Sequence, residues 1–264
     1  MDNDAKKGKT GLFVSKDALS EYVYRVLEKS NDVFPFSFEE IPFAESRIFH
    51  FGDISGIIAA LKEADVRRLA IIGRIPASRL FGKDMQASGK LFLERESTWK
   101  GENLMAGIAA MLEKEGIKVL PLTPLLKEIL AREIVYTEKQ PDKQHLADVK
   151  TGISLLGSIM SFRTGQAAAV KNGMVIAIEG IEGTDSMIKR AGEYCRDFSV
   201  IKMAGRGKDE RFDIPAVGPQ TVKAMADSGA AILAIEAGKT ILLDKEKTVS
   251  LCEENGIILA GVKA

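Results

Sequence analysis

Short apolar runs alternate with longer amphipathic segments along the chain, and this alternation limits the folds open to it. Residues 69–72 form a continuous apolar run between charged residues and Gly73, which is typical of a central parallel strand. Strand patterns at 11–14, 33–38 and 48–51 precede this run, with helical patterns between them. Strand, helix and strand in succession predict a doubly wound α/β domain.

Helix boundary signals agree with this prediction. Asp17 is a well-placed N-cap for the helix that follows the first strand, and Asp53 or Ser55 caps the next helix. Gly116 ends a third helix, because glycine readily adopts the left-handed conformation after a helix C-terminus. We therefore predict a Rossmann-like N-terminal domain over residues 1–136.

A second domain is expected after a polar break. The 264 residues suggest one large or two medium domains. Residues 137–147 are polar and contain Pro141, as in a linker or long surface loop. We place the boundary there, so that residues 148–264 form a mixed α/β domain.

Two hairpins are predicted in this C-terminal domain. Asn172 and Gly173 lie between two apolar runs, which is the strongest short-range hairpin signal in a sequence. Residues 236–239 separate two further apolar runs and predict a second hairpin. The chain then continues with a helix capped by Asp244 and a last strand.

The charge balance limits the partners. Lys plus Arg and Asp plus Glu both number 37, so the formal net charge is zero. This balance argues against a nucleic-acid binder that relies on bulk positive charge. The polar first residues do not resemble a signal peptide, and no apolar run approaches roughly 18 residues. We expect a cytoplasmic protein without a membrane-spanning helix, and peripheral membrane contact stays open.

Cysteine and histidine are too scarce for a zinc site or a disulfide framework. Cys195 and Cys252 lie far apart in sequence and fit reduced thiols. His50 and His145 are the two histidines of the chain. A bound metal would be a hard cation such as Mg2+ or Mn2+, held by carboxylates.

Acids, bases and glycines gather between Glu179 and Gly218. Glu182 and Asp185 lie where an apolar strand gives way to a helix, so they are expected at one edge of a sheet, where α/β folds bind ligands. Thr184 is a candidate N-cap and Asp185 suits the first helical turn, so capping alone also explains both residues.

Several stretches together match the pattern of one family. In the C-terminal half they are Gly165-Gln166, residues 175–190, Lys202, residues 209–221, Glu236-Ala-Gly238 and residues 256–261. In the N-terminal half the match is looser and comprises residues 52–58, 71–75, 100–103 and 115–116. Taken together, these stretches resemble the UDP-2,3-diacylglucosamine pyrophosphatase family of lipid A biosynthesis, in the form that is not a calcineurin-like phosphoesterase.

The resemblance implies hydrolysis of UDP-2,3-diacylglucosamine to UMP and 2,3-diacylglucosamine 1-phosphate, with a divalent cation such as Mg2+ or Mn2+. The family's essential aspartate corresponds to Asp213, which would ligate the metal or orient the water. The implied metal candidates are Glu182, Asp185 and Asp213. The implied substrate-binding candidates are Lys16, Gly73, Lys100, Gly101, Gln166, Thr184, Lys202 and Arg211. Solvated surface charge is the alternative explanation for Lys202 and Arg211.

Two departures from the family pattern keep rival functions open. Residues 14–18 contain no glycine where the family has a glycine-rich loop, and Glu102-Asn103 replaces paired aspartates. One rival is a non-catalytic nucleotide- or lipid-binding homologue, and another is a hydrolase of a different UDP-sugar. The expected partner is a lipid-linked sugar nucleotide at the inner membrane face, and a homodimer also stays open.

Overall fold

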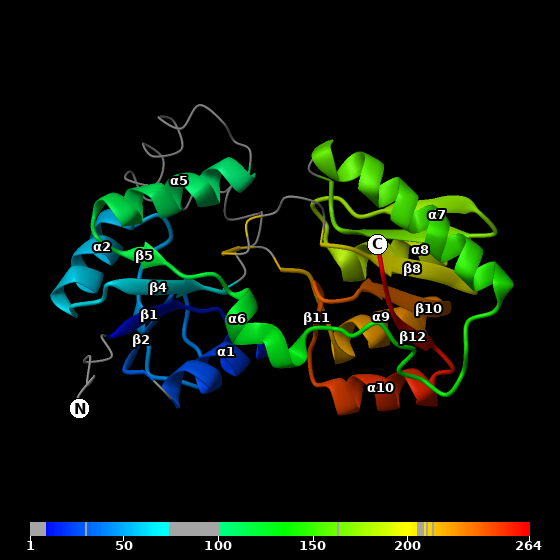
Figure 1. The fold of residues 1–264 in the computed structure, drawn as a ribbon, viewed down its shortest axis with the longest axis horizontal. Helices are drawn as coiled ribbons and strands as arrows, with labels where there is room; N and C mark the ends of the chain where they lie inside the picture. The colour runs from blue at the N-terminus through cyan, green and yellow to red at the C-terminus, as the bar shows by residue number, and fades with distance from the viewer. Residues whose placement is uncertain are drawn as a thin grey trace, which may run out of the picture. The chain divides into compact units, whose positions relative to one another are not determined.

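The chain folds into two compact units, each built around its own sheet (Figure 1). In this computed structural model the described residues are 9–29, 31–73, 101–162, 164–204, 209, 211–212 and 214–264. The first unit comprises Met1–Leu126 with Asp209–Phe212, and the second comprises Lys127–Lys208 with Asp213–Ala264. No helix in the described part of the chain combines the length and apolar character needed to cross a membrane.

The first unit has a fully parallel sheet with strand order β3-β2-β1-β4-β5, which confirms the Rossmann-like prediction. Its strands are β1 (Thr10–Phe13), β2 (Val33–Ser37), β3 (Arg47–Ile48), β4 (Arg68–Ile71) and β5 (Lys118–Val119). Its helices are α1 (Ala18–Glu28), α2 (Ile54–Glu63), α5 (Gly101–Lys114) and α6 (Thr123–Leu126). The strand order reverses beside β1, so the carboxyl ends of β1 and β4 form the switch point where such sheets bind ligands.

The predicted helix signals of this unit are present. The Asp17 carboxylate accepts a hydrogen bond from the Ser20 backbone N–H at 2.7 Å. Asp53, rather than Ser55, caps α2 and accepts from Gly56 at 3.0 Å. Gly116 has a φ of +80° after α5, so it ends that helix as expected.

The second unit has a mixed sheet with strand order β12-β10-β8-β6-β7, together with a two-stranded sheet of β11 and β9. Its strands are β6 (Ala167–Lys171), β7 (Met174–Ile178), β8 (Phe198–Lys202), β9 (Ala216–Val217), β10 (Ala230–Glu236), β11 (Ile241–Leu242) and β12 (Ile258–Val262). Its helices are η1 (Lys127–Ile129), α7 (Lys143–Ile159), η2 (Met160–Phe162), α8 (Thr184–Tyr194), α9 (Pro219–Ser228) and α10 (Lys245–Glu254). Strand β6 runs antiparallel to β7 and β8, whereas β8, β10 and β12 are parallel.

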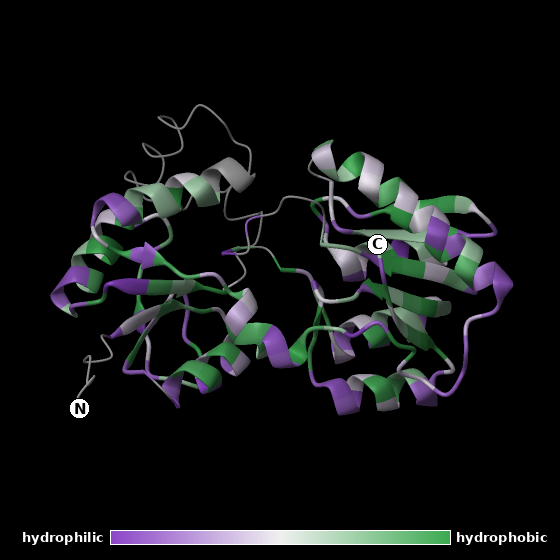
Figure 2. Cartoon of the chain, viewed as in Figure 1, coloured by the Kyte–Doolittle hydropathy of each residue, from purple (hydrophilic) through white to green (hydrophobic). Residues whose placement is uncertain are grey.

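Helices cover both faces of this mixed sheet. Ala167 and Ala169 pack in the cluster that includes residues of α8, α9 and α10, whereas Ala168 and Val170 pack with α7. Alternate residues of one strand thus enter different cores, as the pleat of a strand requires. Strand β10 is buried along its whole length and is coloured as largely hydrophobic in Figure 2.

The segment expected to be a linker belongs to the second unit. The Leu259 backbone N–H donates to Thr137 Oγ1 at 3.2 Å, and the Glu138 backbone N–H donates to the Glu253 carboxylate at 2.6 Å. The polar residues that follow include Asp142, whose carboxylate caps α7 in a capping box with His145. The polar pattern of 137–147 therefore includes a helix start, and the division between the units falls after Leu126.

One predicted hairpin is confirmed and the other is wrong. Asn172 and Gly173 have φ values of +49° and +78°, and they connect antiparallel β6 and β7. Strand β10, by contrast, pairs with β8 and β12, whereas β11 pairs in parallel with β9. The Thr240 backbone N–H donates to the Glu236 carbonyl at 3.0 Å, in a turn that directs the chain out of the main sheet.

Candidate functional site

Charged side chains lie buried at one edge of the mixed sheet. Glu179 directly follows β7, Lys202 ends β8 and Glu236 ends β10, with exposed fractions of 8%, 5% and 4%. Lys202 is paired in register with Ala167 and Ile235, so these strand ends lie at the same edge. Buried charges require partners, and the partners at this edge define the candidate site.

The Glu179 carboxylate is held by backbone and hydroxyl donors. Its Oε2 accepts from the Gln166 backbone N–H at 2.9 Å, and its Oε1 accepts from the Thr184 hydroxyl at 2.9 Å. A Cβ on Gly165 would lie 2.2 Å from Glu179 Cγ, far inside van der Waals contact. Glycine at position 165 is therefore needed for the Glu179 side chain to occupy this place.

Lys202 connects three elements at this edge. Its Nζ donates to Thr184 Oγ1 at 2.7 Å and to the Ala216 carbonyl oxygen at 3.0 Å. Thr184 is the first residue of α8, and Ala216 begins β9. The expectation that Thr184 is the N-cap is wrong, because Gly183 holds that position and the Thr184 hydroxyl is used inside the site.

Two helices begin near these residues with glycine caps. Gly183 is the N-cap of α8 and Gly218 is the N-cap of α9, and neither supplies a side-chain hydrogen bond to the first turn. The N-terminal turn of a helix carries partial positive charge and suits an anion such as a phosphate group. Together with the Lys202 ammonium, these two helix N-termini give this edge of the sheet the positive charge that suits an anionic ligand.

Glu182 is held in the turn between β7 and α8. Its carboxylate accepts from Arg190 at 2.5 Å and from the Gly180 backbone N–H at 3.0 Å, and Arg190 also donates to the Ile178 carbonyl at 2.9 Å. The backbone N–H of Glu182 itself, followed by the Arg190 guanidinium, holds the pKa of this carboxyl below its ordinary value. These contacts fix the turn that leads from Glu179 to α8.

The described residues do not by themselves form a hard-cation site. Within the described ranges, no three His, Cys, Asp or Glu side chains gather in a way that could hold a metal. Glu182 faces Arg190, and Asp185 is exposed in the first turn of α8. Asp213, the third predicted ligand, lies outside the described residues.

Arg211 is engaged within the first unit. Its guanidinium donates to both Asp209 carboxylate oxygens, at 2.9 and 2.7 Å, and to Glu113 of α5 at 3.0 Å. This pairing lowers the pKa of Asp209 and raises the pKa of Arg211. A phosphate that contacted Arg211 would compete with the carboxylates of Asp209 and Glu113. The pairing with Glu113 cannot be predicted from sequence spacing.

Two of the N-terminal candidates, Lys16 and Gly73, lie at the switch point of the first sheet. Lys16 is exposed in the turn between β1 and α1, and Gly73 follows β4. A Cβ on Gly73 would lie 2.6 Å from Phe13 Cε1 and 2.9 Å from the Ser15 backbone nitrogen, so the close approach of these turns requires glycine. Gly101 begins α5, whereas Lys100 lies outside the described residues.

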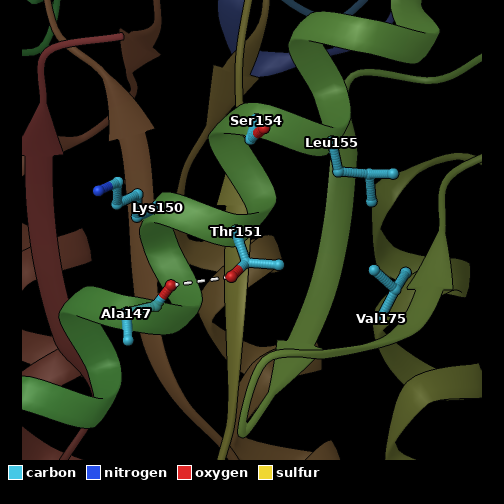
Figure 3. Close-up of a pocket in the computed structure, with 6 residues that line it drawn as sticks. All are labelled: Ala147, Lys150, Thr151, Ser154, Leu155 and Val175. Carbon is cyan, nitrogen blue, oxygen red and sulfur yellow. Dashed lines mark hydrogen bonds between the residues drawn. The ribbon is translucent and has the colours of Figure 1, made fainter.

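A groove of about 600 Å³ lies elsewhere in the second unit, between α7 and β7 (Figure 3). It is lined by Ala147, Lys150, Thr151, Ser154, Leu155 and Val175. None of the residues predicted to bind substrate lines this groove.

Glu179 and Glu236 were not assigned to the site from the sequence. Both stand directly at the end of an apolar strand run, where a buried acid has to be partnered within the fold. Glu236 accepts from the Ala204 backbone N–H at 2.9 Å and from Lys239 at 2.6 Å. An acid that ends a fully apolar run is thus the signal that could have identified both residues.

Comparison with known proteins identifies the family. The LpxI N-terminal domain matches residues 19–129, and the LpxI C-terminal domain matches residues 132–260. A curated relative, UDP-2,3-diacylglucosamine pyrophosphatase LpxI of Caulobacter vibrioides, is 28% identical over 173 residues. That alignment covers 62% of this chain and 62% of the relative, which is less than two thirds of its length. Since both family domains match in order and together span most of the residues, the chain belongs to the LpxI family.

Proposed function

We propose that this protein hydrolyses the pyrophosphate bond of UDP-2,3-diacylglucosamine to UMP and 2,3-diacylglucosamine 1-phosphate. The name of the Caulobacter vibrioides relative supports this substrate. The observation that carries the proposal is the buried Lys202, which lies beside the first residue of α8 at the edge of the mixed sheet. A fixed cation beside an open helix N-terminus suits a pyrophosphate.

Charge stabilisation is the main contribution expected of this edge. Pyrophosphate is anionic, and negative charge redistributes onto its oxygens as water attacks phosphorus. Lys202 and the first backbone N–H groups of α8 and α9 would stabilise that charge without reorganising, because the fold already holds them. Gln166, whose backbone is fixed by Glu179, would contact the sugar or the nucleotide.

Asp213 is the proposed acid–base group or metal ligand, on the basis of the family resemblance. The residues that follow it are well anchored: Pro215 is buried, and its carbonyl accepts from the Ile241 backbone N–H at 2.8 Å.

Dependence on Mg2+ or Mn2+ is part of the proposal. Such an ion would neutralise pyrophosphate charge, and Asp213 with Asp185 or Glu182 are its candidate ligands. Dialysis against a chelator should abolish UMP release, and added Mg2+ or Mn2+, but not selectively Zn2+, should restore it. Full activity in excess chelator would contradict the metal requirement.

Peripheral membrane contact follows from the proposed substrate, whose acyl chains reside in a bilayer. We propose a cytoplasmic protein that meets its substrate at the inner membrane face. Phospholipid vesicles that contain UDP-2,3-diacylglucosamine should bind more of the protein than vesicles without it. The amount of protein that sediments with each kind of vesicle measures this difference. Equal sedimentation with both would oppose this assignment.

The decisive experiment measures UMP by chromatography after incubation of the purified protein with UDP-2,3-diacylglucosamine and Mg2+. We expect the wild-type protein to release UMP and the Lys202→Met variant to release none. An unacylated UDP-sugar serves as the second substrate, and faster turnover of it would favour a hydrolase of another UDP-sugar. No UMP from either substrate would reject the proposed reaction.

A binding protein without turnover is the second candidate, and the turn after β1 favours it. The Ser15 backbone N–H donates to Ser20 Oγ at 3.1 Å, and the Ser15 hydroxyl donates to Asp17. The turn thus makes bonds within itself, and its side chains limit how closely a phosphate or ribose approaches the backbone. Tight binding of the substrate without any UMP release would support this candidate.

A further inference from the structure

A directed chain of hydrogen bonds runs through the candidate site. Lys202 Nζ donates to Thr184 Oγ1 at 2.7 Å, and Thr184 Oγ1 donates to Glu179 Oε1 at 2.9 Å. An ammonium group only donates hydrogen bonds and an ionised carboxylate only accepts them, so the direction of both bonds is fixed. The single hydroxyl hydrogen of Thr184 therefore points to Glu179.

We propose that Glu179 is a positioning residue for Lys202 and acts through Thr184. The inference rests on the proposed function, in which Lys202 contacts the pyrophosphate. It also changes the role of Thr184: the residue orients the lysine and does not donate a hydrogen bond to substrate. The local sequence pattern suggested a helix cap at this position, and the family resemblance implied a direct substrate contact.

The acceptor end of this chain is held firmly. Glu179 Oε2 accepts from the Gln166 backbone N–H at 2.9 Å, and the Glu179 methylene groups fill the space that a side chain at Gly165 would need. The carboxylate has little freedom to turn away from Thr184. Position 179 is thus a rigid anchor rather than a mobile surface acid.

Burial strengthens the effect of this anchor. Glu179, Thr184 and Lys202 are all buried, so their hydrogen bonds lie in a medium of lower dielectric constant than water. The second bond of Lys202, to the Ala216 carbonyl at 3.0 Å, draws the ammonium toward the strand that precedes α9. Together the two bonds hold the charge in one place before substrate arrives, which is what preorganised catalysis requires.

Steady-state kinetics with UDP-2,3-diacylglucosamine and Mg2+ test this chain. Thr184→Val keeps the shape but removes the hydroxyl, and Glu179→Gln replaces a pure acceptor with a group that also donates. Each should lower kcat by about 10-fold to 100-fold with KM changed by less than about threefold, as for loss of a supporting contact. Thr184→Ser should stay within about threefold of the wild-type kcat, because it retains the hydroxyl.

The kcat of the double variant Thr184→Val/Glu179→Gln gives a sharper test of the hydrogen-bond chain. Because Thr184 and Glu179 act as one unit, the double variant should be no slower than the slower single variant. Thr151→Val, in α7, is the matched control: its hydroxyl donates to the Ala147 carbonyl at 3.1 Å outside the site, so kcat should be unchanged. The inference would be overturned if the decrease in kcat of the double variant equalled the product of the two single decreases. Equal kcat values for Thr184→Ser and Thr184→Val would also overturn it.

A stability measurement separates this inference from the proposed function. Glu179→Gln and Lys202→Met should change the free energy of unfolding non-additively in the wild-type background, and the coupling should be smaller in the Thr184→Val background, where only the direct charge attraction is left. Coupling of the same size with and without the hydroxyl would reject the chain. If the wild type releases no UMP, the proposed function fails and the unfolding cycle alone decides the inference. If Glu179→Gln does not fold, the kinetic comparison of Thr184→Ser with Thr184→Val decides it.

Discussion

At the scale of single residues, the absence of a side chain at Gly165 is as important as the acid it faces. A methyl group there would lie 2.2 Å from Glu179 Cγ, so Gly165→Ala should displace Glu179 and loosen Lys202 through Thr184. We expect a loss of about 1–3 kcal/mol in unfolding free energy, typical of overpacking, and a lower kcat. Urea denaturation and UMP release measure the two effects.

Gly157 provides the control for this substitution. It lies in α7, and a Cβ there would have nothing within 4 Å. Gly157→Ala should therefore stabilise the protein by about 0.5–1 kcal/mol, since alanine loses less backbone entropy in a helix. Equal destabilisation by both substitutions would show that steric overlap with Glu179 is not the cause.

Asp213 is the residue on which the proposed chemistry most depends. Asp213→Ala should reduce turnover by roughly 10²–10⁴-fold, the range for loss of a positioned acid–base group, and leave the melting temperature unchanged. Asp227→Ala removes an exposed acid from α9 and should change neither quantity. A rate close to wild type for Asp213→Ala, with normal melting, would remove this residue from the mechanism.

Residue roles were predictable where the partners are close in sequence. Asp17 and Asp53 cap their helices because each carboxylate reaches a backbone N–H three residues later. The family resemblance made Arg211 a candidate phosphate contact, and its pairing with Glu113, 98 residues away, could not be predicted from local spacing. Thr184 likewise suggested a cap, because its contact with Lys202 depends on how the strands are ordered in the sheet.

At the scale of elements, the turn between β7 and α8 should make stability depend on pH. The folded pKa of Glu182 is lowered, so this carboxyl stabilises the folded state above its unfolded pKa of about 4.3. That contribution is lost as pH falls through the lower, folded pKa. The stability difference between wild type and Glu182→Gln should therefore shrink as pH falls from about 5 to about 3.

Arg190 supplies the control for this pH effect. It donates to Glu182 and to the Ile178 carbonyl, so Arg190→Met should weaken the pH dependence that Glu182 causes. Denaturation curves for the single and double variants, compared at pH 7 and below pH 4, measure the change. A Glu182 contribution that grows on acidification would contradict the lowered pKa.

Hairpins show how far local patterns determine elements. Asn172 and Gly173 adopt the positive φ values that a tight hairpin turn requires, so local chemistry predicted this turn correctly. The turn from Glu236 to Thr240 has similar local signals, but β11 finds its partner in β9. Strand pairing is decided by burial of both faces in the sheet, which a local pattern does not contain.

At the scale of the whole molecule, the division into units does not follow the order of the sequence. The α/β class and the two sheets were predictable from alternating strand and helix patterns. The assignment of Asp209–Phe212 to the first unit was not, because nothing in that segment indicates its distant partners. Phe212 packs with Phe13, Leu69 and other residues of the first core, and its exposed fraction is 7%.

This arrangement predicts that a substitution in the C-terminal half will destabilise the first unit. Phe212→Ala leaves a cavity in the core around Phe13 and Leu69, at a cost on the order of 3–5 kcal/mol for loss of a buried aromatic ring. Hydrogen exchange of backbone amides in the full chain should therefore accelerate in β1 and β4. Tyr194→Ala, which removes a 74% exposed ring from α8, should leave exchange unchanged. If Phe212→Ala accelerates exchange in β8 and β10 alone, the segment belongs to the second unit instead.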